Sequence, residues 1–181
     1  MFRRYSGFLL FIFIGLTGCA SNITRQTPDV QTRRVSSAEL VWVNPGAIPM
    51  AVTTSSYGFY SSPAAPNIEY ATKEVGELLT EIRSQMSTQI ETALKDGGAI
   101  RGDDAQIRIR VTKTFHTITG PGAVLVVSVH FKESPSGAKP WSVEIKGGTP
   151  IGSDRKSVAS KFARAAVEEL AAAGIIQAKP Q

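Results

Sequence analysis

Cysteine and histidine are scarce in this sequence of 181 residues. Cys19 is the only cysteine, and His116 and His130 are the only histidines. A single thiol excludes an internal disulfide framework and a site built from paired thiolates. Long apolar runs are scarce too. Residues 7–18 are apolar except for Thr17, but twelve helical residues rise only about 18 Å, which is short of a hydrocarbon core of about 30 Å.

The sequence also lacks a basic block and the usual catalytic motifs. Its formal charge is +5, and the lysines and arginines are spread along the chain, whereas nucleic-acid binders concentrate them. Asp103 and Asp104 fit a turn before a strand, and no Gly-x-Ser-x-Gly elbow is present. His116 and His130 are expected on one hairpin face but roughly 13 Å apart, too far to share a metal. We therefore expect no enzyme activity, metal or cofactor, and no nucleic-acid partner.

What is present at the N-terminus is a complete export pattern. Arg3 and Arg4 form a positive segment, residues 7–18 form the apolar segment, and Cys19 closes it. This layout is typical of a secretory signal.

Leu16, Thr17, Gly18 and Cys19 resemble the bacterial lipobox at all four positions. The resemblance implies that residues 1–18 are a cleaved lipoprotein signal peptide and that Cys19 carries the lipid. Acyl chains on one residue would hold the protein to a membrane. An aspartate after the cysteine retains many lipoproteins at the inner membrane, and Ala20 and Ser21 stand there instead. The resemblance thus implies a lipid-anchored outer-membrane protein facing the periplasm of a Gram-negative bacterium. An uncleaved membrane helix and an ordinary secreted protein are the alternatives.

The mature chain is long enough for one domain. Removing residues 1–18 leaves 163 residues and lowers the formal charge from +5 to +3, and that length suffices for a separate core. Residues 19–37 are polar and are expected to form a flexible tether that begins with the lipidated cysteine. The domain is expected at residues 38–176, followed by a tail at residues 177–181.

Apolar periodicity predicts the elements of this domain. Residues 72–95 carry one helical stripe and end near Gly97, a glycine suited to a left-handed cap. Residues 154–173 fit a second helix capped by Ser153 or Asp154 and followed by Gly174. Strands are expected at residues 38–43, 106–115, 123–131 and 141–146.

Two segments are candidates for a binding surface. Alternation in the strand at 106–115 places Arg108, Arg110 and His116 on a basic polar face opposite the core. Residues 44–70 form a long Pro-, Ser- and aromatic-rich loop whose rings at Tyr57, Phe59 and Tyr60 suit a partner contact. The alternatives are a solvated sheet face, and rings that pack back on the core with a short strand at residues 50–54.

The element order β-α-β-β-β-α predicts an α+β fold: two helices packed on one face of a four-stranded, mostly antiparallel sheet. This order and the anchor resemble small periplasmic lipoproteins, among them the lipopolysaccharide-assembly lipoprotein family. The expected function is that of a non-catalytic accessory lipoprotein, held to the membrane through Cys19, that binds an envelope protein complex or lipid. An envelope-polymer hydrolase and a purely structural envelope protein are the alternatives.

Overall fold

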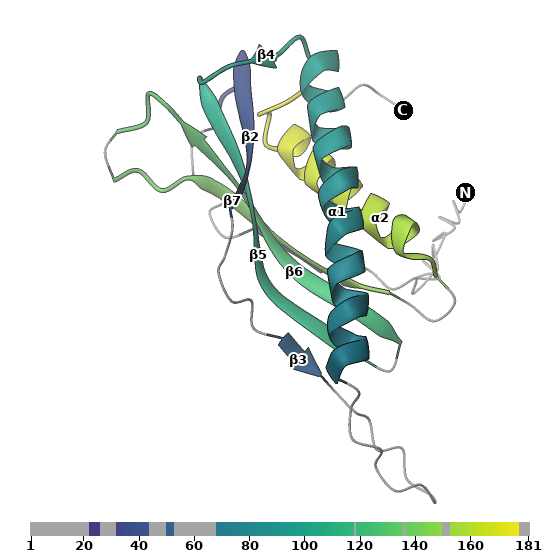
Figure 1. Cartoon of the computed structure of the whole chain (residues 1–181). Helices are drawn as coiled ribbons and strands as arrows, with labels where there is room; N and C mark the ends of the chain where they lie inside the picture. Colours follow the sequence, from purple (N-terminus) through teal and green to yellow (C-terminus); the bar gives the residue numbers. More distant parts are fainter. Residues whose placement is uncertain are drawn as a thin grey trace, which may run out of the picture.

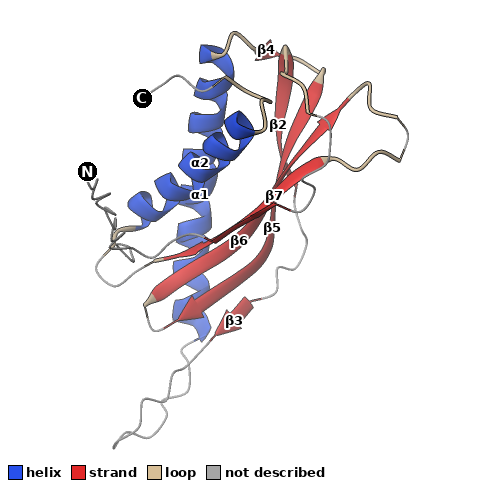
Figure 2. Ribbon diagram, turned by 180° about the vertical axis from the view of Figure 1, so that it is seen from behind, coloured by secondary structure: helices blue, strands red, loops and turns tan. Residues whose placement is uncertain are grey.

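The computed structural model describes residues 22–25, 32–43, 50–52, 68–117, 119–135, 137–149 and 153–177. Within these ranges the chain forms a sheet and two helices that lie on one face of it (Figure 1). The view from behind places both helices on the same side of the sheet (Figure 2). The elements are α1 (Ile68–Asp96), α2 (Arg155–Ala172), β1 (Asn22–Arg25), β2 (Ser37–Val43), β3 (Met50–Val52), β4 (Ile100–Arg101), β5 (Ala105–Thr117), β6 (Gly120–Phe131) and β7 (Trp141–Gly148).

The expected α+β class is confirmed, but four strands were too few. The described residues form a seven-stranded sheet with the order β1-β7-β6-β5-β2-β4, and β3 also pairs with β5. β1, β3 and β4 are only two to four residues long, so they are too short to show an alternating pattern. A short strand near residue 50 was one of the alternatives for the loop, and β3 occupies that position.

The sheet is mixed, with its long strands in the middle. β6 pairs antiparallel with both β5 and β7, whereas β2 pairs parallel with the first half of β5. β3 pairs parallel with the far end of the same strand. The two parallel strands therefore share one edge of β5 in succession.

The expected apolar stripes form the core between the sheet and the helices. On α1 the residues at helical spacing are fully or almost fully buried, and β5, β6 and β7 contribute every second residue. Phe162 of α2 is 1 % exposed, and its ring lies 3.0 Å from where a Cβ on Gly147 would be. A glycine at that position therefore lets α2 approach β7 closely.

The second helix is confirmed at both ends, and the first is not. Asp154 caps α2 by accepting a hydrogen bond from the Ser157 backbone N–H at 2.7 Å, and Gly174 follows with a φ of +70°. α1 begins at Ile68 rather than residue 72, inside the segment expected as a loop. The left-handed glycine is Gly98, at φ +79°, rather than Gly97, because the Gly97 N–H still donates to the Ala93 carbonyl.

The prediction of a flexible tether at residues 19–37 is wrong for Asn22–Arg25 and for Val35. Asn22–Arg25 pairs with β7 as an edge strand, and backbone pairing of this kind requires no apolar pattern. Val35 is 3 % exposed, and its N–H donates to the Ile175 carbonyl at 3.0 Å. This polar stretch is thus joined to the domain through partners that lie far away in the sequence.

Candidate binding face

The sheet face that points away from the helices, called the outer face here, carries the predicted arginines. In β5 the core residues are Ile107 and Ile109, both fully buried, so Arg108 and Arg110 lie on the opposite face. Neighbouring strands add matched positions by register: Ser128 beside Arg108 and Val126 beside Arg110 on β6, then Ser142 and Glu144 on β7, with Val41 and Val43 on β2. The two arginines therefore occupy successive rungs of one open face.

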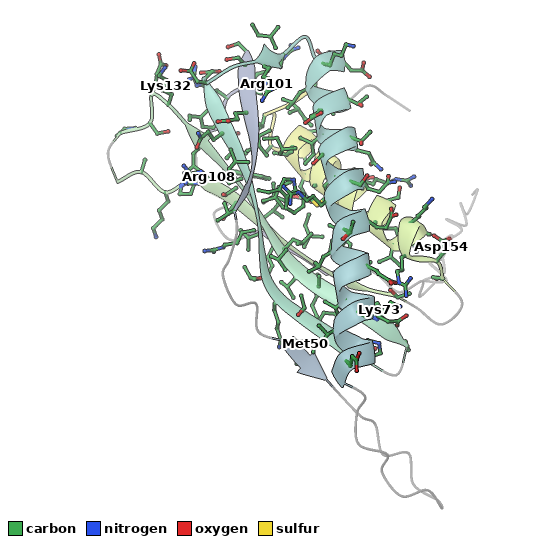
Figure 3. All side chains as sticks on the ribbon, in the orientation of Figure 1. Met50, Lys73, Arg101, Arg108, Lys132 and Asp154 are labelled. Carbon is green, nitrogen blue, oxygen red and sulfur yellow. The ribbon has the colours of Figure 1, made fainter. Side chains whose placement is uncertain are left out.

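Arg108 is held in place by its neighbour on the same strand. Its Nε and Nη2 atoms donate to the Gln106 Oε1 atom at 3.1 and 2.7 Å, which fixes the guanidinium and leaves its remaining N–H donors unused by this contact. Among the described ion pairs, none involves Arg108 or Arg110. Figure 3 labels Arg108 at the sheet, away from α1. The pair thus offers donors to an anion.

The arginines border a hollow of about 320 Å³ in the outer face, called the arginine hollow here. Its lining combines basic, polar and apolar side chains: Val43, Arg108, Arg110, Val126, Ser128, His130, Pro140 and Ser142. A site of this composition suits a single carboxylate or phosphate group, because arginine binds such groups through paired N–H donors.

His130 lies in the same hollow. Its Nε2 atom is 3.2 Å from the Ser128 Oγ atom. Burial, and secondarily the Arg108 charge, hold the pKa of His130 below its ordinary value of 6.5. His130 is therefore mainly neutral at pH 7 and adds a hydrogen-bonding group to the hollow.

The predicted position of His116 is wrong: it lies on the helix face. The register between β5 and β6 shifts between Val111 and Lys113, and Thr112, the extra residue, donates its hydroxyl to the Val124 carbonyl at 3.2 Å. This bulge reverses the alternation, so that Phe115 joins the outer face and Thr114 and His116 leave it. A run of alternating residues contains no marker for such a shift.

His116 instead belongs to a cluster that joins the sheet to both helices. Its Nε2 atom is 3.3 Å from the Glu74 carboxylate on α1. Arg155 of α2 contacts the other oxygen of Glu74, and it contacts Glu77 at 2.7 Å. The cluster borders a separate hollow of about 780 Å³. Since both glutamates contact Arg155 and Glu74 also contacts His116, the cluster connects β5, α1 and α2.

The other predicted site residues lie outside the described residues. These are Cys19 with the rest of the lipobox, and the aromatic residues Tyr57, Phe59 and Tyr60. Within the described ranges, no group of three or more His, Cys, Asp or Glu side chains is placed to hold a metal ion. No helix in the described part of the chain combines the length and apolarity needed to cross a membrane.

Part of the hollow was accessible to sequence reasoning. Alternation in residues 123–131 places Ser128 and His130 opposite the core, as observed. The contributions of Ser142 and Val43 depend on strand order, and the Gln106 contact depends on a side-chain conformation. Neither leaves a local pattern in the sequence.

Comparison with known proteins gives little beyond these observations. No protein-family model matches the chain, and no curated protein matches it. Among solved structures, a point variant of the PelC dodecamer from Paraburkholderia phytofirmans is 13% identical, with 86% of this chain and 98% of that chain covered and a TM-score of 0.43. A second PelC dodecamer structure from the same organism is 13% identical over 87% and 100% of the two chains, with a TM-score of 0.38. These scores carry no functional argument.

Proposed function

We propose that this chain is a lipid-anchored accessory protein of the bacterial outer membrane, facing the periplasm, that works by binding an anionic group of an envelope partner rather than by catalysis. The anchor is supported by Leu16, Thr17, Gly18 and Cys19, which follow a basic and then an apolar segment. The partner is a protein complex or a lipid of the envelope that presents carboxylate or phosphate groups.

The single observation that carries the binding role is the arginine hollow. Arg108 and Arg110 lie on successive rungs of an open sheet face, and Gln106 orients Arg108. Exposed cations on a sheet are common, but a guanidinium that is held by a neutral acceptor keeps its charge available to an incoming anion. The apolar positions beside it, Val43 and Val126, add contact area of the kind found at partner interfaces.

The anchor is tested by mass spectrometry of the mature protein purified from membranes. The expected N-terminus is Cys19, with the mass of the attached acyl chains. A bare thiol at Cys19, or an intact residue 1–18 segment, would contradict the anchored part of the proposal.

The binding role is tested by affinity capture from solubilised envelopes, followed by identification of the captured proteins and lipids. A partner is expected to be captured by the wild type and lost with the Arg108→Glu/Arg110→Glu variant. The matched control is Lys95→Glu/Arg101→Glu, which makes the same charge change on exposed positions of α1 and β4. Equal capture by both variants would show that the arginine hollow is not the binding site.

A further inference from the structure

The first strand lies very close in the chain to the proposed lipid. Asn22 begins β1 and is only three residues after Cys19. Three steps of about 3.8 Å between successive Cα atoms span at most about 11 Å. If Cys19 is acylated, as the proposed function holds, the end of the sheet at Asn22 stays within that distance of the lipid attachment point. The domain is then held at the membrane surface and not on a long tether.

This end of β1 identifies one edge of the molecule. β1 is the outermost strand on the β7 side of the sheet, opposite the β2 and β4 side. Asn22 is paired with Lys146 of β7, and Phe162 of α2 packs over the neighbouring Gly147. The N-terminal half of α2 therefore lies over the part of β7 that adjoins the start of β1. Figure 1 shows α2 beside α1.

The exposed side chains of α2 from Lys156 to Arg164 are basic or uncharged. Lys156, Lys161 and Arg164 are exposed, and Lys161 and Arg164 are three residues apart, which puts them on one face of the helix. None of the three takes part in an ion pair among the described residues. The acidic residues of α2, Glu168 and Glu169, follow Arg164 in the chain, so within the helix the positive charge is concentrated in residues 155–164.

We infer that the edge formed by β1 and residues 155–164 of α2 lies against an anionic phospholipid surface, with Lys161 and Arg164 contacting the headgroups. This inference rests on the proposed acylation of Cys19, and it adds an orientation to the anchor. Lysine and arginine side chains close to an anionic leaflet are attracted to it, and the attraction fades within a Debye length. A lipid attached three residues from β1 keeps this edge of the sheet, and the basic part of α2 that packs over it, on the membrane side of the domain. The outer face and its arginine hollow then remain open to a partner.

The experiment measures how close two faces of the acylated full-length mature protein lie to a bilayer. A fluorophore is attached at Ser157→Cys, on the exposed face of α2, or at Ile100→Cys, on the opposite edge of the sheet, where Ile100 is 72 % exposed. Acylation leaves no other free thiol, since Cys19 is the only native cysteine. The vesicles contain phosphatidylethanolamine and phosphatidylglycerol together with a headgroup quencher.

Quenching is expected to be several-fold stronger at position 157 than at position 100. The difference should shrink in vesicles of phosphatidylcholine alone, and in 1 M salt, where the Debye length falls to about 3 Å. Lys161→Glu/Arg164→Glu should abolish it. Lys95→Glu/Arg101→Glu, an equal charge change at the opposite edge, should leave it intact.

Two results would overturn the inference. Equal quenching at the two positions in acylated protein would mean that the domain rotates freely about its anchor, and the proposed function would still stand. A difference that survives charge reversal at Lys161 and Arg164 would mean that these side chains do not contact the headgroups. An unacylated Cys19, detected by mass spectrometry of the same sample, would overturn both this inference and the anchor.

Discussion

At the scale of single residues, the outer face contains a close contact that only glycine permits. The ring of Phe115 lies over Gly122 and Gly148, and the Lys146 Nζ atom is 5.9 Å from the ring centroid. A Cβ on Gly122 would lie 2.2 Å from the Phe115 Cε2 atom and 2.8 Å from the Gly147 carbonyl oxygen. Both distances are far below van der Waals contact, so this position must remain a glycine.

We therefore predict that Gly122→Ala lowers the free energy of unfolding by about 1–3 kcal/mol, the usual cost of overpacking. Gly76→Ala is the control. A Cβ at Gly76 meets nothing within 4 Å, and alanine in α1 should raise stability by up to about 1 kcal/mol through helix propensity. Urea denaturation of both variants measures the two effects. A Gly122→Ala protein as stable as the wild type would refute the packing of Phe115 described above.

A second prediction at this scale concerns the pKa of His130. Arg108 is the second cause of its lowered pKa, after burial. Arg108→Gln should therefore raise the pKa of His130 toward 6.5 without reaching it, whereas Arg110→Gln should change it less. NMR titration of the imidazole signals measures the shift, and His130→Asn identifies which of the two histidine signals is which. An equal pKa shift in both arginine variants would contradict a specific effect of the Arg108 charge on His130.

The sign of the pH effect follows from the lowered pKa of His130. The folded state binds a proton at this side chain less readily than the unfolded state does, so stability declines as the pH falls below 6.5, the ordinary value. The decline ends once the pH is below the pKa of the folded state. Replacing His130 with asparagine should remove this component from a plot of unfolding free energy against pH.

At the scale of elements, Glu74 links three parts of the fold. Its side chain is 16 % exposed and pairs with His116 of β5 and Arg155 of α2. We predict that Glu74→Gln lowers the free energy of unfolding by about 1–2 kcal/mol, the range for a hydrogen bond to a charged group reduced by the solvent exposure of Arg155. Thermal or urea denaturation measures the change.

Glu91→Gln is the matched control for this cluster. It makes the same substitution on α1 at an exposed position, where surface changes usually stay within about 0.5 kcal/mol. If the two variants lose equal stability, the cluster around Glu74 does not hold α1 to β5 and α2.

The long elements were largely predictable, and the bulge in β5 explains why His116 was misplaced. The stripe of α1 and the alternation in β5, β6 and β7 are local periodic patterns, because a helix or a half-buried strand imposes its own period on the residues it buries. The arginines of the hollow were placed correctly for that reason. His116 was misplaced because one extra residue, Thr112, shifts the phase of the strand. Whether a strand contains a bulge depends on how it pairs with its partner strand, and the local alternation of residues does not show that pairing.

At the scale of the whole molecule, the two ends of the described domain are joined. Thr32 donates its hydroxyl to the Ala173 carbonyl at 2.5 Å, and Val35 donates its N–H to the Ile175 carbonyl. Ile175 is fully buried. Neither segment has a periodic pattern, because each is only a few residues long and finds its partners more than a hundred residues away. Contacts at that separation are fixed by the assembled core, so a polar stretch before the first predicted strand was interpreted as a tether.

This junction gives the last prediction. Ile175→Ala should lower the free energy of unfolding by about 2–5 kcal/mol, the range for removing a buried aliphatic side chain. It should also speed hydrogen exchange of the Val35 amide, because that amide donates to the carbonyl of residue 175. Ile100→Ala is the control, since Ile100 is 72 % exposed and its loss should cost little. A Val35 amide that exchanges in the wild type as fast as in an unstructured peptide would restore the tether interpretation for residues 32–36.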